Sequence, residues 1–176
     1  VKIVTGDGRR FLRECVKKGI KFDIIIADLT DPYTQGVALL YTKEFYEIVK
    51  NTLASDGIFV TQATSPYFNT DAYVSIYKTL STVFPIVRTA RVWLPTFGEW
   101  GYIIASRYYD PAELAPKNIK EQMSLRNITT TYYNEEVHSS MFARPKYLIK
   151  AINDDKIRVT TDDDLAALYY MIESDD

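Results

Sequence analysis

The 176-residue sequence has little of what disulfides and transition-metal centres are built from: one cysteine, Cys15, and one histidine, His138. A single cysteine excludes an intramolecular disulfide, and a chain without disulfides is typical of the reducing cytoplasm. Zinc and iron sites need clustered histidine or cysteine ligands, whereas these two residues lie in distant segments. The sequence therefore predicts no metal cofactor and a cytoplasmic location, with His138 as a packing or surface residue.

The sequence also lacks a strong charge of either sign and a long hydrophobic run. Its formal net charge is −2, and scattered lysines and arginines provide no basic face for a phosphate backbone, so a nucleic-acid partner is not expected. No apolar stretch reaches the roughly 18 residues that span a bilayer, so no membrane partner is expected of this chain. A slightly acidic protein with clustered aspartates is instead suited to a cation, either a metal ion or an organic amine.

Apolar residues make up 47% of the chain, which is enough for one core. We expect residues 1–150 to form the main unit and residues 151–176 to form a helical tail on the body or on a partner subunit. Because the chain begins with Val1 inside a strand-like pattern, we also expect that its native N-terminal part is missing.

Strand-like and helix-like patterns alternate along the chain. Residues 1–7 and the apolar run 22–28 predict strands, and the second reads as covered on both faces. Helical spacing follows over 42–53 and 73–80, with a buried strand at 57–63 between them. Two further strands, near 86–95 and 100–109, are joined by a short loop and predict an antiparallel pair. The sequence thus predicts an α/β fold with a mostly parallel sheet and an antiparallel hairpin at one edge.

Polar side chains follow each predicted strand of the parallel part. Asp7 follows the first strand, Asp28 and Asp31 the second, and Gln62 the third, so we expect them to converge on one cleft. Asp28 directly continues a buried run and would be costly to desolvate without a cation. No basic residue follows in the loop before Lys43. An amine is the better candidate cation, because a metal site would need more ligands.

Two of these expectations have ordinary structural alternatives. Asp7 lies between two glycines, Gly6 and Gly8, where the backbone can approach a flat ligand, but it can also simply cap the next helix. Aromatic residues near the strand ends can form a box for an ammonium group, or can belong to the core of the hairpin. These aromatic residues are Tyr33, Tyr67, Phe68, Trp93, Phe97 and Trp100.

Five ordered motifs carry a family resemblance. They are "GDGRRFL", "FDIIIADLTDP", "LYTKEFY", "GIFVTQATSPYF" and "LPTFGEWGYIIAS". In this order and spacing they resemble the polyamine aminopropyltransferases, the spermidine synthase family, over residues 1–150. The resemblance implies a Rossmann-like sheet of the class I methyltransferase type. It also implies transfer of an aminopropyl group from decarboxylated S-adenosylmethionine to an amine, with release of methylthioadenosine.

The resemblance also implies roles for individual residues. Asp28 matches the catalytic aspartate that takes a proton from the attacking amine, and Asp31 matches the acid that holds the amino end of the aminopropyl group. Asp7, with its neighbour Gly8, matches the position that contacts the adenine of the donor. Gln62 matches a glutamine on the acceptor side.

The acceptor loop departs from the common family pattern. Phe97 stands where many spermidine synthases have a tyrosine, and Glu99 and Trp100 belong to a variant in which Glu99 could bind a further ammonium. The acceptor therefore stays open among putrescine, agmatine and spermidine. The resemblance further implies a homo-oligomer, a dimer or a tetramer. Two alternatives are a methyltransferase that uses ordinary S-adenosylmethionine and a non-catalytic module for polyamine binding or dimerisation.

Overall fold

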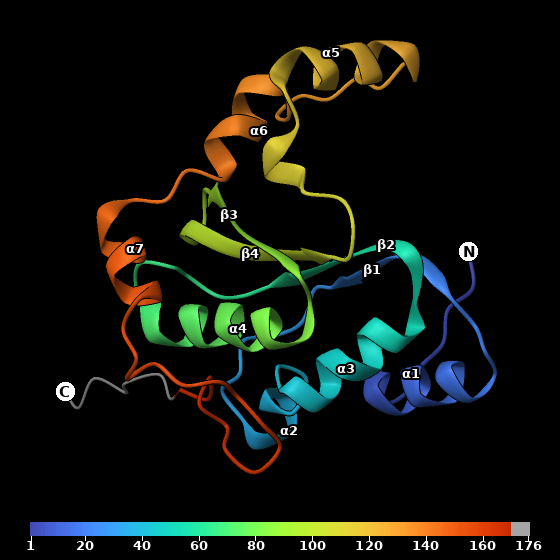
Figure 1. Ribbon diagram of the computed structural model, residues 1–176, viewed down its shortest axis with the longest axis vertical. Coiled ribbons are helices and arrows are strands. Elements are labelled where there is room, and N and C mark those ends of the chain that lie inside the picture. The colour runs from blue at the N-terminus through green and yellow to red at the C-terminus, as the bar shows by residue number, and fades with distance from the viewer. Residues whose placement is uncertain (170–176) are drawn as a thin grey trace.

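The computed structural model describes residues 1–169, which form a four-stranded sheet with helices on both sides (Figure 1). The strands are β1 (Phe22–Ala27), β2 (Leu53–Gln62), β3 (Ile86–Leu94) and β4 (Gly98–Ser106). The α-helices are α1 (Gly8–Lys17), α2 (Gln35–Ala38), α3 (Lys43–Thr52), α4 (Thr70–Val83), α5 (Pro116–Leu125), α6 (Glu135–Met141) and α7 (Lys146–Ile152). A short 3-10 helix, η1, spans Pro111–Glu113.

The strand order is β1-β2-β4-β3. β1 and β2 are parallel, whereas β4 is antiparallel to both of its neighbours, so the chain turns back at the end of β3 and inserts β4 next to β2. The α/β class and the antiparallel edge hairpin are confirmed. The expected mostly parallel sheet is not observed among the described strands, because only one of their pairings is parallel.

The N-terminal segment differs from its prediction. Residues 1–5 form no strand, and the side chains of Val1, Ile3 and Val4 are exposed. A β-branched sequence becomes a strand only where a neighbouring strand takes up its backbone hydrogen bonds, and none of residues 1–169 pairs with this segment. β1 is also covered on one face rather than two, because Ile24 and Ile26 are exposed while Ile25 packs against the core.

The core lies between the sheet and helices α3 and α4. Thr42 caps α3 by accepting a hydrogen bond from the amide of Phe45 at 3.3 Å, and Phe45 and Val49 face the core one turn apart. On α4, the predicted i, i+3, i+7 positions Tyr73, Ile76 and Leu80 are fully buried. The predicted helices are thus confirmed where an apolar stripe repeats at helical spacing.

Beyond the hairpin, α5 and α6 pack together and project from the body, and α7 lies beside α4 (Figure 1). α6 and α7 are short helices of seven residues each. His138 is a buried packing residue, since its ring nitrogens contact the hydroxyl of Tyr133 at 2.8 Å and the carbonyl of Pro111 at 2.7 Å. Within residues 1–169, every helix is too short or too polar to cross a bilayer.

The C-terminal tail packs on the body, but its described part is not the predicted helix. Residues 157–169 run as an irregular segment, in which the backbone groups of Thr160 bond the body. Its carbonyl accepts from the amide of Lys43 at 2.9 Å, and its amide donates to Thr79 Oγ1 at 2.9 Å. The last part of the predicted tail, residues 170–176, lies outside the described residues.

Candidate functional site

Asp31 is the centre of a buried polar cluster beyond the carboxyl ends of β1 and β2. Its exposed fraction is 7%. Oδ1 accepts from Gln62 Nε2 at 3.0 Å, and Oδ2 accepts from the hydroxyls of Tyr33 and Thr64, each at 3.0 Å. Oδ2 also accepts from the hydroxyl of Tyr169 at 2.6 Å. All four donors are neutral, and within residues 1–169 no cationic side chain pairs with Asp31.

Gln62 orients this carboxylate. Its side chain is 3% exposed, and besides Asp31 it donates to the hydroxyl of Tyr41 at 2.7 Å and accepts from the amide of Thr64 at 2.8 Å. Burial raises the pKa of Tyr41, so its hydroxyl stays protonated and donates to the carbonyl of Thr30 at 2.9 Å. The convergence of Gln62 with Asp31 was predicted. The expected acceptor-side contact is not free, because both N–H groups of Gln62 already have partners.

Thr64 supports the cluster from a strained backbone conformation. Its φ of 61° lies in the left-handed region, which a β-branched residue rarely adopts and which costs on the order of 1–3 kcal/mol. Gly101 of β4 fixes this conformation by donating its amide to the carbonyl of Thr64 at 2.8 Å. A Cβ at Gly101 would lie 2.3 Å from Cε2 of Tyr73 and 2.8 Å from that carbonyl oxygen, so only glycine allows this approach.

Tyr169 is the member of the cluster that sequence reasoning missed as a site residue. Its hydroxyl lies 2.7 Å from Thr64 Oγ1 and accepts from Asn69 Nδ2 at 3.1 Å, and its ring meets that of Tyr33 edge-on at 4.9 Å between centroids. Burial, and then the hydrogen bond to Asp31, raise the pKa of Tyr169, so the hydroxyl remains a donor at neutral pH. The two residues are 138 positions apart, and no local pattern links them.

Asp28, in contrast, is exposed, which corrects the expectation of a buried carboxylate. In a strand, alternate side chains share a face, and Asp28 continues the exposed face of Ile24 and Ile26. No hydrogen bond to its side chain occurs within residues 1–169. Burial, and to a smaller extent the charge of Asp28, raise the pKa of Tyr102 on β4.

Glu99 is not the free carboxylate that the sequence suggested. Its Oε1 forms an ion pair with Arg91, and its Oε2 accepts from the hydroxyl of Tyr147 at 2.9 Å. Burial, followed by this hydrogen bond, raises the pKa of Tyr147 to about 12. Arg91 and Glu99 lie on the two paired strands of the hairpin, so a cross-strand ion pair already neutralises the charge that was expected to bind an ammonium.

The structure brings together part of the predicted aromatic set. Tyr67, Phe68, Trp93 and Phe97 line a hollow of about 550 Å³ at the tip of the hairpin. Their rings are exposed, so they are not residues of the hairpin core. Trp100 packs on Phe97 at 5.0 Å between ring centroids, whereas Tyr33 lies in the Asp31 cluster instead.

Asp7 and Gly8 lie apart from that cluster. Asp7 is exposed and caps α1 by accepting a hydrogen bond from the amide of Arg10 at 2.7 Å. It thus has the helix-capping role that was the alternative to ligand binding. Together with Gly6 and Gly8 it lines a separate hollow of about 540 Å³. The structure therefore places Gln62 within hydrogen-bonding distance of Asp31, as expected. It does not show the single cleft that was expected to include Asp7 as well.

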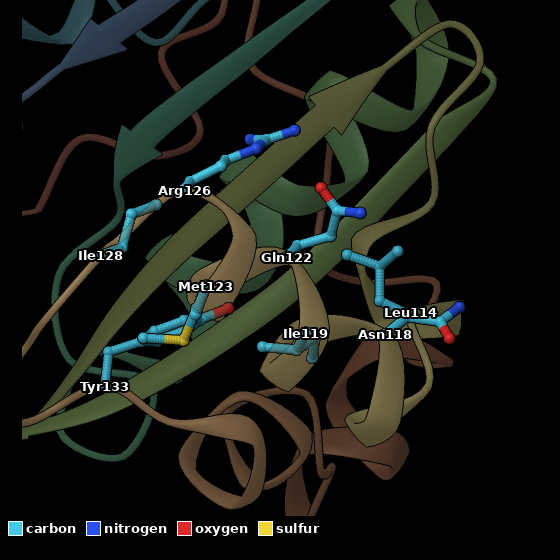
Figure 2. A pocket seen from close by; sticks show the side chains of 8 residues that line it. All are labelled: Leu114, Asn118, Ile119, Gln122, Met123, Arg126, Ile128 and Tyr133. Atoms are coloured by element: carbon cyan, nitrogen blue, oxygen red, sulfur yellow. The ribbon is translucent and has the colours of Figure 1, made fainter.

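A further groove, of about 370 Å³, lies along α5 and is shown in Figure 2. It is lined by Leu114, Asn118, Ile119, Gln122, Met123, Arg126, Ile128 and Tyr133. No lining side chain is a carboxylate, so this groove has no group that would neutralise an amine.

The fold has close counterparts among solved structures. Human methyltransferase-like protein 13 in complex with SAH aligns with a TM-score of 0.52 at 16% identity over 82% of this chain and 60% of that chain, a likeness of fold alone. A spermidine synthase in complex with the transition-state analogue AdoDATO aligns with a TM-score of 0.74 at 32% identity. That match covers 86% of this chain and 50% of that one. The fold is thus the Rossmann-like one that methyltransferases and spermidine synthases share.

The sequence comparison narrows this class to one family. Residues 1–115 match the spermine/spermidine synthase domain, and the chain belongs to that family. A polyamine aminopropyltransferase of Desulforudis audaxviator is 38% identical over 149 residues, which is 84% of this chain and 50% of that protein. The chain therefore spans about half the length of the curated relatives that it matches.

Proposed function

We propose that this chain carries the amine-binding part of an aminopropyltransferase that uses decarboxylated S-adenosylmethionine. The observation that carries the proposal is Asp31, a carboxylate that is 7% exposed and surrounded by neutral donors in a chain of the spermine/spermidine synthase family. An alkylammonium about 4 Å from such a carboxylate gains roughly 4 kcal/mol at an effective dielectric constant of 20, before desolvation is subtracted. Asp31 is thus the anchor for the ammonium end of the aminopropyl group.

The transfer itself needs no covalent enzyme intermediate. The amine nitrogen attacks the propyl carbon next to the sulfonium, a C–N bond forms, and the C–S bond breaks with its electron pair returning to sulfur. The products are the extended polyamine, a proton and neutral methylthioadenosine. Since sulfur is already a good leaving group, the protein has to position the two substrates and accept the proton.

Asp28 is the proposed proton acceptor. An alkylammonium resembles lysine, with a pKa of about 10.4, and it has no free electron pair at neutral pH. Transfer of its proton to an ordinary aspartate is uphill by about 6 pKa units, or roughly 9 kcal/mol. Because Asp28 is exposed, we assign the compensating effect to the sulfonium cation, which makes a neighbouring ammonium more acidic.

The other proposed contacts lie around these two acids. Phe97 and Trp100, at the hairpin tip, are the proposed wall for the methylenes of the acceptor, and Asp7 and Gly8 are the proposed contacts for the adenine. Gln62 acts by orienting Asp31. We propose putrescine, agmatine or spermidine as the acceptor, and a dimer or tetramer in the cytoplasm as the working assembly.

A methyltransferase that uses ordinary S-adenosylmethionine is the nearest alternative. Its donor carries a carboxylate, which the negative charges of Asp28 and Asp31 would repel, whereas the decarboxylated donor presents only the ammonium. This difference in electrostatics favours aminopropyl transfer. The second alternative is a non-catalytic polyamine-binding module. It shares the Asp31 site with the aminopropyltransferase and differs only in that it forms no product.

One experiment separates these alternatives. The protein is incubated with decarboxylated S-adenosylmethionine and, in turn, putrescine, agmatine, spermidine and cadaverine, and methylthioadenosine is measured by mass spectrometry. We expect methylthioadenosine that depends on both the donor and the amine. S-adenosylhomocysteine formed from ordinary S-adenosylmethionine would favour the methyltransferase, and amine binding without either product would favour the non-catalytic module.

A further inference from the structure

The C-terminal strap, residues 157–169, closes over the Asp31 cluster from a distant part of the sequence. Figure 1 shows this segment in red, running past α4 and α2. It is held at two points before it reaches the cluster. Asp162 pairs with Arg9 at 2.6 Å and accepts from Thr42 Oγ1 at 2.8 Å. Thr160 is fully buried and bonds Thr79 on α4.

At the end of the strap, the hydroxyl of Tyr169 occupies an acceptor position of Asp31. Oδ2 of Asp31 already receives the hydroxyls of Tyr33 and Thr64, so Tyr169 is its third donor. A carboxylate oxygen offers about two lone-pair directions. Oδ1 has one donor, Gln62. An ammonium group that bonds both carboxylate oxygens therefore needs one of the three hydroxyls on Oδ2 to leave.

The three hydroxyls differ in how firmly they are held. Thr64 is fixed by its contact with Gly101, and Tyr33 belongs to the same turn as Asp31, with its amide 2.7 Å from the carbonyl of Asp31. Tyr169 lies in a segment without regular structure, and its amide bonds the carbonyl of Pro32 at a longer 3.3 Å. Tyr169 is thus the donor that leaves with the smallest rearrangement of the fold.

We propose that Tyr169 is a gating residue for the amine site: its hydroxyl takes the place of the ammonium on Oδ2 of Asp31 and must be displaced before an ammonium can bond both carboxylate oxygens. The inference rests on the proposed amine site. An ammonium displaces the phenol because its positive charge adds a Coulomb attraction to the carboxylate that a neutral hydroxyl lacks. The same contact excludes neutral alcohols, which gain nothing over the phenol that they would replace. The strap therefore sets both the affinity of the site and its preference for cations.

The test is a calorimetric titration of decarboxylated S-adenosylmethionine, whose ammonium Asp31 is proposed to hold, into the 176-residue chain and its variants. Tyr169→Phe keeps the ring and removes the competing donor, so we expect this ligand to bind on the order of tenfold more tightly. Asp162→Asn loosens the strap without touching Asp31, and we expect it to tighten binding severalfold. Tyr133→Phe, which removes a hydroxyl bonded to His138 away from the cluster, is the matched control and should leave the affinity unchanged.

A second readout follows the strap itself. Saturating decarboxylated S-adenosylmethionine should speed hydrogen exchange of residues 157–169 in the wild type and not in Asp31→Asn. Equal or weaker binding of this ligand by Tyr169→Phe, with binding by the wild type intact, overturns the gate and leaves the amine site standing. Absence of its binding by the wild type, Tyr169→Phe and Asp162→Asn alike overturns both. Binding by Tyr169→Phe alone supports the gate most strongly.

Discussion

Asp31 and Glu99 are two carboxylates that the sequence assigned to ammonium binding, and their surroundings differ in one respect. Glu99 forms an ion pair with Arg91, so its charge is already neutralised across the hairpin. Asp31 has four neutral donors and, within residues 1–169, no cationic partner. Both are hydrogen-bonded, and only Asp31 retains a charge that a cationic ligand can neutralise.

The difference shows how a carboxylate can be prepared for a cation. Hydroxyl and amide donors hold Asp31 in one orientation and offset part of its desolvation, yet they leave its net charge in place. An arginine would have made the site more stable and would also have competed with the ligand. A buried carboxylate served only by neutral donors is therefore a stronger sign of cation binding than one in an ion pair.

The largest expected effect concerns the third carboxylate, Asp28, which has neither kind of partner. Asp28→Asn keeps the shape of the side chain and removes the proton acceptor, so we expect turnover to fall by about 10²- to 10⁴-fold. The affinity for the donor, decarboxylated S-adenosylmethionine, should stay nearly unchanged, because Asp31 supplies the anchor for its ammonium. Parallel assays of methylthioadenosine release and of donor binding check this, and near-normal turnover would remove Asp28 from the proton-accepting role.

The second prediction concerns Gly101, whose close approach to Thr64 supports the Asp31 cluster. Gly101→Ala places a methyl group against Tyr73 and the carbonyl of Thr64, at 2.3 and 2.8 Å, and should cost about 2–4 kcal/mol of unfolding free energy. Urea denaturation measures this cost. Gly36→Ala is the matched control, because a Cβ at Gly36 meets nothing within 4 Å, and it should be neutral or slightly stabilising. Equal stability of both variants would show that the close approach does not constrain Thr64.

Arg91→Met should make Glu99 resemble Asp31, because it replaces the arginine partner of Glu99 with a neutral side chain. It removes the cation and leaves Glu99 with the hydroxyl of Tyr147 as its partner. We expect a loss of about 1–2 kcal/mol of unfolding free energy, since the pair is only partly buried. Chemical denaturation gives the value. If stability is unchanged, the ion pair is not what satisfies Glu99.

The smallest expected effect is the pH dependence of the strap. The hydrogen bond from Arg9 lowers the pKa of Asp162 from its ordinary value of 3.8, so the folded state binds this proton less readily than the unfolded chain. The contribution of Asp162 to stability is therefore complete above about pH 4 and is lost as the pH falls through the lowered pKa. Melting temperatures of the wild type and Asp162→Asn should differ at pH 7 and converge as the pH falls below the lowered pKa of Asp162. Asp163→Asn, at the next position along the strap, is the control.

Much of the fold could be predicted because its signals are local. The apolar stripe of Tyr73, Ile76 and Leu80 predicted α4, and the short loop before Gly98 predicted the hairpin. The convergence of Asp31 with Gln62 followed from their positions after neighbouring parallel strands. The exposure of Asp28 could not be predicted from its apolar run, because that run reads as covered on both faces, whereas within residues 1–169 the face of β1 that carries Ile24 and Ile26 is left open.

The parts that were missed depend on contacts between distant segments. Tyr169 reaches Asp31 across 138 positions, and a polar tail with caps and acids reads locally as a helix. The pairing of Arg91 with Glu99 was accessible in principle. Once the hairpin is assumed, its register places the two side chains on neighbouring strands, and a charge-pair search across strands would have found it.

The central claim is that Asp31, and not Glu99, is the carboxylate that binds the amine. A calorimetric titration of decarboxylated S-adenosylmethionine, which presents the aminopropyl ammonium, into the wild type, Asp31→Asn and Glu99→Gln tests it most directly, with circular dichroism to show that each variant is folded. We predict that Asp31→Asn weakens binding by about 100-fold or more, the order expected when a charge-assisted contact is lost, and that Glu99→Gln changes the affinity by less than about twofold. Retained affinity in Asp31→Asn, or a large loss in Glu99→Gln, would contradict the claim.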